Sequence, residues 1–490
     1  MSVRLGSTVV GVEEHRVDVV IVGSGGGGAP AALELASAGR DVMVLEAGPR
    51  ILPEEFAQRP LDTVRRVYVD KGGQETVDGS VSILQGSCVG GSTVVNGEVC
   101  FRIPDRVLEE WARDFGVDGM GPKAMSGVFA EVEERIHASV GDGKHVDASV
   151  LVEPGMVALG LDPKPVKRNT KGCRGCNYCF FGCAWGCKQS MDQSYLPAAI
   201  AAGARVISDA RVERIEMRGT CAEGVVARTP HGTLKVRAKH VVLACGAIAT
   251  PLMLQDHELG GPEVGRNLAV HPICGIFGWY DDVQPQRTAA MIGVYSDAYA
   301  ADDILLETVT APRDFYAALV PGFGRAHREL VREMDHMAGL ASIVRDTGGL
   351  GTVGRDKRGK KRITWTMDAA TEKKIRLGIR RCVEVHLAGG ARKVTLPSLD
   401  LLTVGPEDDA AKIDRLVEKL PLGAADVTYL SYHPQGTARI GAVTDQDARV
   451  RGTENLYVMD TSLFPSPVGV NTQVPVMAVS TMMARKLASR

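Results

Sequence analysis

Short apolar runs rich in β-branched residues alternate with glycine turns near both ends of this chain. Four of the runs are typical of buried parallel strands; they are residues 17–22, 41–45, 241–243 and 455–459. The first run ends in Gly23–Gly28 and passes directly into residues 29–35, which predict a helix. A strand, a glycine turn and a helix in this order predict an α/β fold with a Rossmann-like domain.

The glycine turn carries the spacing of a dinucleotide-binding site. Gly23 allows the tight turn, Gly25 lets a pyrophosphate approach the backbone, and Gly28 lets the helix pack closely on the strand. Glu46 follows the second strand, where a carboxylate would accept hydrogen bonds from an adenosine ribose. A carboxylate here favours a ribose without a 2′-phosphate, so the motif predicts NAD or FAD without choosing between them.

The middle and later parts of the chain show other patterns. Residues 362–368 predict a possible strand, and residues 369–387 an amphipathic helix. The basic, glycine-rich stretch of residues 348–361 predicts an exposed turn or the tip of a hairpin.

Composition supports a nucleotide-binding enzyme and excludes some partners. The chain has 490 residues, enough for two domains or one elaborated domain, and its 56 glycines exceed ordinary usage, as several nucleotide-cradling turns require. The net charge of -2 gives no electrostatic reason to expect nucleic acid or an anionic membrane as a partner.

The N-terminus and the hydropathy of the chain bear on its location. Residues 1–16 lack an apolar core of signal-peptide length, and no apolar run reaches about eighteen residues. We therefore expect a soluble, cytoplasmic protein with no membrane partner.

A second glycine-rich segment, residues 85–97, is suited to bringing backbone N–H groups against a planar ring or a diphosphate. Here the chain resembles the glucose-methanol-choline (GMC) oxidoreductases, and the resemblance continues through residues 241–251, 264–272 and 455–460. It implies FAD as the cofactor. It also implies that residues 205–215 form one strand, whose backbone near Val212 holds the adenine. The other cofactor-binding residues that it implies are Gly86, Gly91, Ser92, Asn96 and Gly97 near the ring, Asp460 near the diphosphate and ribityl, and Asn471 and Thr472.

Two residues near the C-terminus match the alcohol-handling pair of that family. His433 matches its active-site histidine, and Asn471 a second position that holds His or Asn in relatives. Oxidising an alcohol through a flavin requires removal of the hydroxyl proton as hydride leaves the carbon, and a histidine can accept that proton. We therefore expect His433 to be the base and Asn471 a positioning donor. Other histidines, including His271, His327, His336 and His386, are expected to be structural or surface residues.

Five cysteines lie within fifteen residues, at Cys173, Cys176, Cys179, Cys183 and Cys187. The first four have the C-x2-C-x2-C-x3-C spacing of bacterial ferredoxins. An iron-sulfur cluster (4Fe-4S or 3Fe-4S) is the leading interpretation, with zinc and reduced structural or redox-active thiols as alternatives. In ferredoxins the fourth cysteine of such a run serves another cluster, so the fourth ligand here is open.

The family motifs predict a discontinuous FAD-binding domain from about residues 14–105, 190–275 and 430–490. Residues 106–189 are expected to form a helical, cysteine-rich insertion. Residues 276–430 are expected to form an α+β substrate domain, whose antiparallel sheet would roof the flavin.

The leading function is FAD-dependent oxidation of a small-molecule alcohol, with oxygen or another electron acceptor reoxidising the flavin. The substrate is sugar-like, steroid-like or another organic alcohol, with a slight preference for a sugar or glycoside. A competing class is a redox-sensing or electron-carrier flavoprotein without alcohol turnover. Flavin reduction by a panel of alcohols separates the two.

Overall fold

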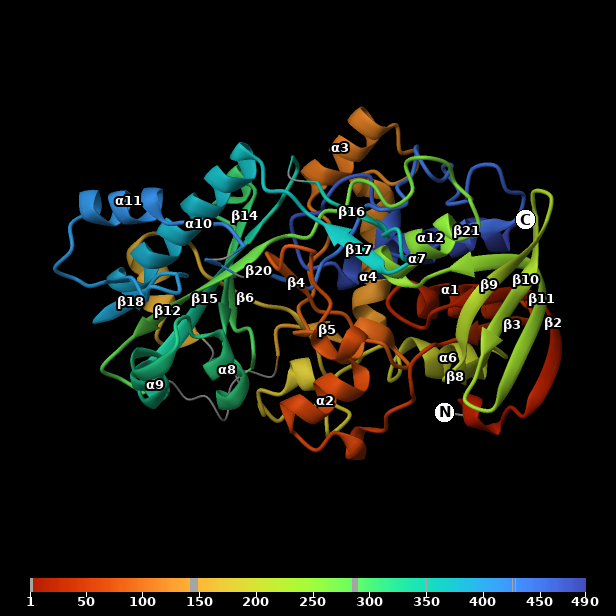
Figure 1. The fold of residues 1–490 in the computed structure, drawn as a ribbon, viewed down its shortest axis with the longest axis horizontal. Coiled ribbons are helices and arrows are strands. Elements are labelled where there is room, and N and C mark those ends of the chain that lie inside the picture. The colour runs from red at the N-terminus through yellow and green to blue at the C-terminus, as the bar shows by residue number, and fades with distance from the viewer. Residues whose placement is uncertain (1–2, 142–148, 284–289, 349, 425, 428) are drawn as a thin grey trace.

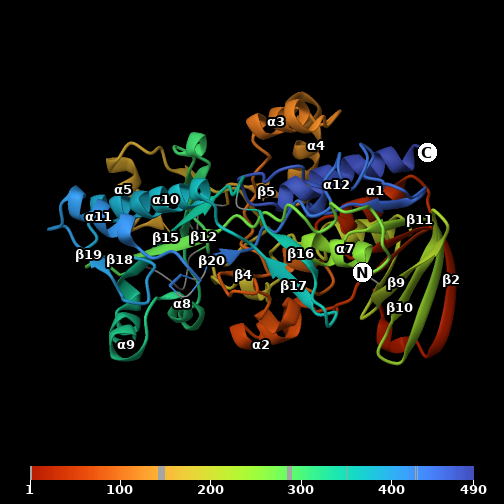
Figure 2. The same cartoon turned by 45° about the horizontal axis from the view of Figure 1, so that its top comes forward.

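The computed structural model describes residues 3–141, 149–283, 290–348, 350–424, 426–427 and 429–490. Two large sheets dominate it. In Figure 1 the first sheet lies at the right, on the side of both chain ends, and the second lies at the left. Figure 2 shows the same arrangement from above.

The first sheet has eight strands. In spatial order they are β1 (Arg4–Leu5), β8 (Arg205–Ser208), β3 (Val42–Leu45), β2 (Gly11–Val22), β11 (Gly232–Leu243), β10 (Cys221–Arg228) and β9 (Arg211–Arg218), with β21 (Leu456–Val458) also on β11. Strands β1, β8, β3, β2, β11 and β21 are parallel, whereas β9 and β10 are antiparallel. The predicted Rossmann-like α/β architecture is confirmed, and its strands come from distant parts of the chain.

Helices cover this sheet and complete its core. The helix α1 (Gly28–Ser37) follows β2 and packs against α6 (Tyr195–Ala201) and α12 (Gln473–Ala488), and α12 in turn packs against α4 (Pro122–Arg135). The apolar stretches of the central parallel strands are buried, at residues 42–45, 241–243 and 456–458 and over most of residues 17–22, whereas the first half of β2 is largely exposed.

The second sheet has nine strands. Its main path is β19 (Thr403–Val404), β18 (Lys393–Thr395), β12 (Ile273–Trp279), β15 (Met337–Val344), β14 (Ile304–Val309), β13 (Val294–Ser296) and β6 (Lys164–Pro165). The strands β20 (Tyr429–Ser431) and β4 (Val81–Ile83) join at its side. Along the main path every pair is antiparallel.

The two faces of the second sheet meet different surroundings. One face packs against α10 (Ala369–Ala388), which contacts β12, β14 and β15. Side chains such as Ile276 and Leu306 share a buried cluster with Ile379 of that helix. Neighbouring residues of a strand point to opposite faces. On the other face, Phe277 and Trp279 of β12 share a second buried cluster with Tyr316 and Leu330.

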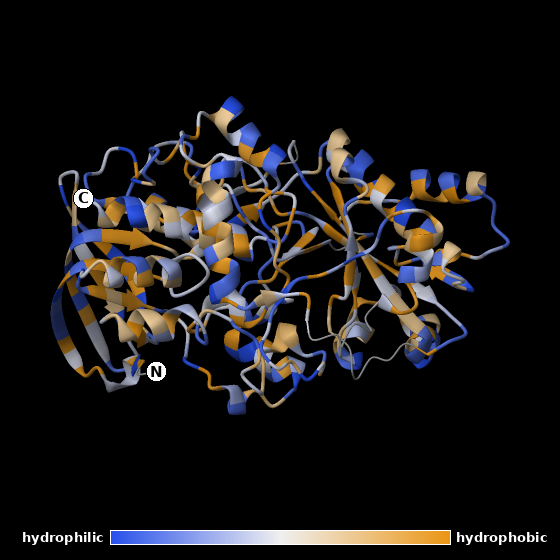
Figure 3. Ribbon diagram, turned by 180° about the vertical axis from the view of Figure 1, so that it is seen from behind, coloured by the Kyte–Doolittle hydropathy of each residue, from blue (hydrophilic) through white to orange (hydrophobic). Residues whose placement is uncertain are grey.

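The remaining helices surround these layers. They are α2 (Pro60–Val67), α3 (Asp105–Phe115), α5 (Glu153–Ala158), α7 (Gly246–Gln255), α8 (Arg313–Leu319), α9 (Gly324–Arg332) and α11 (Ala410–Lys419). Apolar and polar residues alternate along many of the helices in Figure 3, as expected where one face of a helix is buried. Within the described part of the chain, no helix is both long and apolar enough to cross a membrane.

The structure corrects two predicted strands. Residues 205–215 form two strands, β8 and β9, because Asp209 between them has a φ of 52° and interrupts the extended backbone. The strand expected at residues 362–368 is shorter, since β17 (Lys361–Thr364) ends early and Asp368 instead caps α10 by accepting a hydrogen bond from Thr371 N.

Two further predictions in this region are met. The amphipathic helix expected over residues 369–387 is α10. The stretch of residues 348–361 contributes the hairpin of β16 (Thr352–Arg355) and β17, whose tip is exposed; Gly349 lies outside the described residues. Two short strands, β5 (Ala138–Ser139) and β7 (Arg168–Asn169), pair separately.

Candidate active site

One cavity of about 1070 Å³ collects nearly all the residues predicted to bind a cofactor or act on an alcohol. Its lining includes Gly23, Gly25, Glu46, Gly86, Gly91, Ser92, Asn96, Gly97, Val212, Asp460, Asn471, Thr472 and His433. Strand ends of the first sheet supply one part of the wall, and the second sheet supplies another. Gly28 is absent from this wall.

The glycine turn after β2 has the space that a dinucleotide needs. A Cβ atom added to Gly25 would find its nearest neighbour, Gly91 Cα, only at 3.7 Å, so the backbone there is open to a bound group. A Cβ atom on Gly28 would lie 2.0 Å from Gly23 O. Gly28 therefore serves the close approach of helix and strand, and Gly25 the approach of a ligand.

Glu46 lies buried at the end of β3 and is fixed before any ligand binds. Its Oε2 accepts hydrogen bonds from Ser24 N at 3.0 Å and Ser24 Oγ at 2.7 Å, and its Oε1 accepts one from Gly48 N at 2.9 Å. Burial raises the pKa of Glu46, and these hydrogen bonds oppose that change. The carboxylate is thus preorganised at the cavity wall, where the motif expects a ribose.

The second glycine-rich segment is braced from behind. Gly86 N donates to Ser92 Oγ at 3.0 Å, and Asn96 Nδ2 donates to Gln473 Oε1 at 2.7 Å. The buried Lys188 donates to the backbone oxygens of Val94 and Asn96 at 3.0 and 2.8 Å. These bonds hold the segment rigidly against the cavity.

Asp460 lies just after the end of β21 and accepts hydrogen bonds from two neighbouring segments. Its Oδ2 accepts from Gly246 N at 2.9 Å and Thr250 Oγ1 at 2.6 Å, and its Oδ1 accepts from Ser462 N at 2.8 Å. Burial raises its pKa, while the hydrogen bonds lower it. The donor and acceptor set along this wall, with its open glycine backbone, fits an FAD molecule.

His433 lies on the same cavity and is only 6% exposed. Burial lowers the pKa of His433 to about 4, so the imidazole is neutral in the neutral pH range. Its Nδ1 is buried without a hydrogen-bond partner in the described structure. The preceding residue, Tyr432, stacks on Phe180 with ring centroids 5.0 Å apart, which fixes the direction of this segment.

The sequence did not predict the residues that join the His433 segment to the Asn471 loop. Gln435 Nε2 donates to His433 O at 3.0 Å, and Gln435 Oε1 accepts from Val468 N at 3.0 Å. His271 Nε2 accepts from Gly469 N at 3.0 Å. His271 therefore helps to hold the loop that carries Asn471. The one sequence signal for this was that His271 lies within the family-like residues 264–272.

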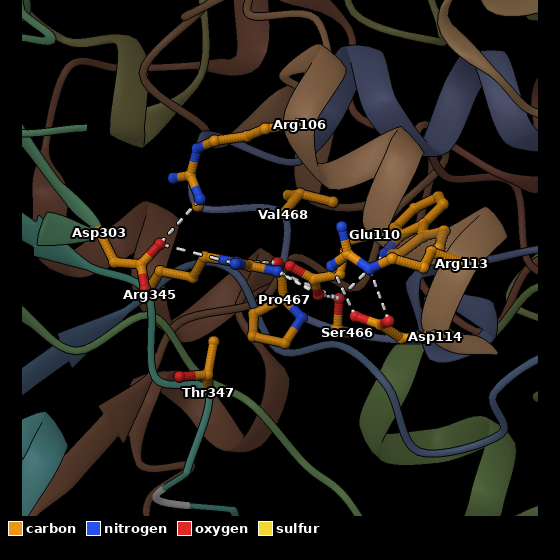
Figure 4. Close-up of polar contacts among 12 residues, drawn as sticks. Arg106, Glu110, Arg113, Asp114, Asp303, Arg345, Thr347, Ser466, Pro467 and Val468 are labelled. Atoms are coloured by element: carbon orange, nitrogen blue, oxygen red, sulfur yellow. Dashed lines mark hydrogen bonds and ion pairs between the residues drawn. The ribbon is translucent and has the colours of Figure 1, made fainter. Parts of the chain in front are cut away.

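A buried arginine fixes the turn that leads to Asn471. Arg345 Nε donates to Pro467 O and its Nη2 to Glu110 Oε1, both at 2.6 Å. Figure 4 shows Arg345 between Asp303 and the turn at Ser466. Glu110 of α3 also accepts from Ser466 Oγ at 2.6 Å, so Arg345 and α3 together hold the turn in one position. No local pattern in the sequence indicated this.

The five cysteines surround a different, smaller cavity of about 10 Å³, which is the space of roughly one water molecule. Gly175 N donates to Cys173 Sγ at 3.4 Å, and Cys187 N donates to Cys183 Sγ at 3.2 Å. Burial raises the pKa of Cys176 to about 11. In the described residues no group of three or more His, Cys, Asp or Glu side chains is arranged to hold a metal ion.

The cysteine loop nevertheless touches the main site. Lys188 Nζ donates to Cys179 O at 2.6 Å and to Asn96 O, so one ammonium group links the loop to the second glycine segment. Phe180, which follows Cys179 in the chain, lines the main cavity.

A Rossmann-like sheet with a dinucleotide cradle, together with a buried neutral histidine on the same cavity, is typical of an oxidoreductase that uses a dinucleotide cofactor. Comparison with known proteins is more specific. The model of the GMC oxidoreductase family matches residues 64–273 and 345–480, and that of an FAD binding domain matches residues 18–52.

Individual proteins similar to this chain support the same family. An uncharacterized GMC-type oxidoreductase of Mycobacterium tuberculosis is 34% identical, over 97% of this chain and 76% of the relative. A long-chain-alcohol oxidase of Arabidopsis thaliana is 28% identical, over 96% of this chain and 67% of the relative. The crystal structure of pyridoxine 4-oxidase from Mesorbium loti has the same fold, with a TM-score of 0.72 at 17% identity, covering 96% of this chain and 99% of that one. The chain belongs to the GMC oxidoreductases and is an FAD-dependent enzyme.

Proposed function

We propose that this enzyme oxidises the hydroxyl group of an apolar alcohol to a carbonyl. The observation that carries the proposal is that His433 and Asn471 line the same cavity as the dinucleotide cradle. Bound FAD supplies the hydride acceptor. The residues proposed to hold it are the glycine turn, Glu46, Val212, Asp460, Thr472 and the Gly86–Gly97 segment.

His433 is the proposed proton acceptor. Because Nδ1 is buried and without a partner, we assign Nε2 as the atom that receives the hydroxyl proton. The lowered pKa keeps the ring neutral, which a base requires. Asn471, held by the turn that Arg345 and His271 fix, positions the substrate oxygen.

The cavity wall on the side of the second sheet favours an apolar substrate. Phe277, Ile292, Val309, Phe315, Leu319, Val320 and Leu399 line it. Sugars carry several hydroxyl groups that would lose hydrogen bonds with water against such a wall, whereas an alkyl chain gains from burial. The sugar substrate expected from sequence stays untested, and we propose an apolar alcohol in its place.

Anaerobic mixing with a panel of alcohols tests this proposal. We expect a long-chain alcohol such as dodecanol to bleach the bound flavin at least about 10-fold faster than glucose, because a single methylene contributes about 0.8 kcal/mol when buried. Faster bleaching by glucose would contradict the apolar substrate. No bleaching by any alcohol would favour the carrier flavoprotein. Reoxidation in air and with an artificial acceptor then distinguishes oxidase from dehydrogenase.

We separately propose, from the cysteine spacing, that an iron-sulfur cluster in this loop relays electrons to an acceptor. Its support is that five thiols of one loop line one small cavity beside the flavin segment. If a cluster forms, fresh protein should contain iron and sulfide besides flavin, and Cys176→Ser should remove its broad visible absorption. The matched control is Cys221→Ser, since Cys221 lies outside the loop on β10. Protein with flavin but without iron would contradict the proposal and leave the thiols as structural groups.

A further inference from the structure

The second sheet turns one face toward α10 and the other toward the main cavity. On β12, β14 and β15, residues such as Ile276, Leu306 and Leu340 share a buried cluster with α10. Neighbouring residues of a strand point to opposite faces, so the alternate residues face away from α10. Those of them that line the main cavity are Ile273, Gly275, Phe277, Glu307, Val309 and Ala341.

The strand register orders this face into three rows that cross β12, β15 and β14. They are Ile273, Ile343 and Leu305; then Gly275, Ala341 and Glu307; then Phe277, Gly339 and Val309. The place beside Gly339 is filled, since an added Cβ atom there would lie 2.3 Å from Tyr316 Oη. On β12 and β15 the middle row carries no side chain larger than a methyl group. Gly275 and Ala341 therefore form the floor of a groove between larger side chains, the Gly275 groove.

Neither backbone conformation nor packing requires a glycine at position 275. The residue lies inside the regular strand β12 and does not have a positive φ. Among the described atoms, an added Cβ would contact Phe277 Cζ alone, at the ordinary distance of 3.7 Å. Gly278 on the opposite face differs, because a Cβ there would lie 2.5 Å from His386 Nδ1. A glycine inside a strand weakens it and often marks a place where a ligand approaches closely.

Buried polar atoms in the same cavity point to a ligand. Glu307, which follows Ala341 in the middle row, is 4% exposed, and its Oε1 has no hydrogen-bond partner in the described structure. His433 Nδ1 also lacks one. Buried polar atoms are normally hydrogen-bonded, so a bound molecule with a polar group would satisfy what the protein leaves open. A molecule with one polar group and an apolar body suits these atoms and the groove together.

The groove lies close to the segment that carries His433. Strand β20 pairs with β12 through Leu430 and Ile273, and His433 follows two residues after the end of β20. Leu430 and His433 line the same cavity as Gly275. A substrate whose hydroxyl group lies at His433 can therefore extend its apolar body across β12.

We propose that the Gly275 groove binds the alkyl chain of the alcohol, and that Gly275 and Ala341 determine which alcohols the enzyme accepts. The inference rests on the proposed function and leaves its oxidation step unchanged. Each methylene group that is buried contributes about fourfold to binding. A side chain that fills the groove should therefore weaken the binding of long-chain alcohols more than that of short ones.

Anaerobic rapid mixing with decanol and with propanol tests the groove. Varying the alcohol concentration gives an apparent Kd for each alcohol from the rate of flavin reduction. In Gly275→Leu the Kd of decanol relative to that of propanol should rise about 30-fold, the contribution of about two to three buried methylenes. Ala341→Leu, on the neighbouring strand, should shift the ratio in the same direction. A ratio that stays at the wild-type value in both variants would overturn the proposal.

Two alanine variants compare the glycine that faces the cavity with one that faces α10. Gly275→Ala should have a Tm at least as high as wild type, because its Cβ has space and alanine costs a strand less than glycine. Gly278→Ala should lower the Tm, since hydrogen bonds to Tyr280 and Ile276 hold the His386 ring in place, and it should keep the wild-type ratio of Kd values. A Gly275→Ala protein destabilised as much as Gly278→Ala would show that packing requires Gly275, and would refute the inference.

Binding of decanamide separates this inference from the proposed function. Decanamide has a chain of the same length as decanol, but an amide group replaces the oxidisable alcohol. Calorimetric titration of the FAD-loaded enzyme should show about 30-fold weaker binding to Gly275→Leu than to wild type. If this loss is present while no alcohol reduces the wild-type flavin, the groove is supported and the proposed function fails. If alcohols reduce the flavin but decanamide binds both proteins equally, the groove is wrong and the proposed function is retained.

Discussion

Replacing His433 with alanine is expected to slow reduction of the bound flavin by an alcohol by about 10³-fold. The side chain is the one neutral, titratable base that the family motif and the cavity share. Its removal leaves the hydroxyl proton without an acceptor while the glycine turn and Glu46 are unchanged. The variant should therefore retain FAD and its visible spectrum.

Stopped-flow absorbance under anaerobic conditions measures the effect, with His231→Ala as the control. His231 lies exposed in the turn between β10 and β11, away from the cavity, and its loss should leave the rate unchanged. Normal reduction kinetics in His433→Ala would refute the assigned role.

Gly28→Ala should have the largest effect on the fold and on FAD retention. The added Cβ atom would lie 2.0 Å from Gly23 O, which is backbone and cannot rotate away. Helix α1 must then shift from β2, which disturbs the glycine turn. We expect a loss of about 3 kcal/mol or more in the free energy of unfolding, with purified protein largely free of flavin.

Gly127→Ala is the matched control. This glycine lies in the middle of the helix α4, exposed and with no atom within 4 Å of an added Cβ. The change should raise stability by about 0.5 to 1 kcal/mol, because alanine favours the helix. Denaturant unfolding and flavin absorbance report both variants. A Gly28→Ala protein as stable and as yellow as wild type would contradict the close packing.

The sequence alone determined the dinucleotide cradle and the strands that carry it, because contiguous backbone forms that site. The motif has a fixed spacing: a tight turn, the start of a helix, and an acid at the end of the next strand. Gly23, Gly25 and Glu46 show this spacing in the sequence. The helix over residues 369–387 could be predicted for a similar reason, because the periodic spacing of its apolar residues lies within one short segment. The motif residues His433 and Asn471 also stood out in the chain, and their chemistry remains a prediction until tested.

Only the tertiary structure decided which residues support that chemistry. His271 meets Gly469 across 198 residues, and Arg345 meets Glu110 across 235, so no local pattern could indicate either contact. Glu307 looks like an ordinary polar residue in a strand, and only the folded structure makes it a buried acid in the cavity wall. The same holds for the cysteines, whose spacing suggests a cluster while their packing places them around a space of one water molecule. Residues that are neighbours in the sequence determine local backbone geometry, so the sequence predicts it. Burial and hydrogen bonds between distant residues arise only when the chain folds, so the sequence alone does not predict them.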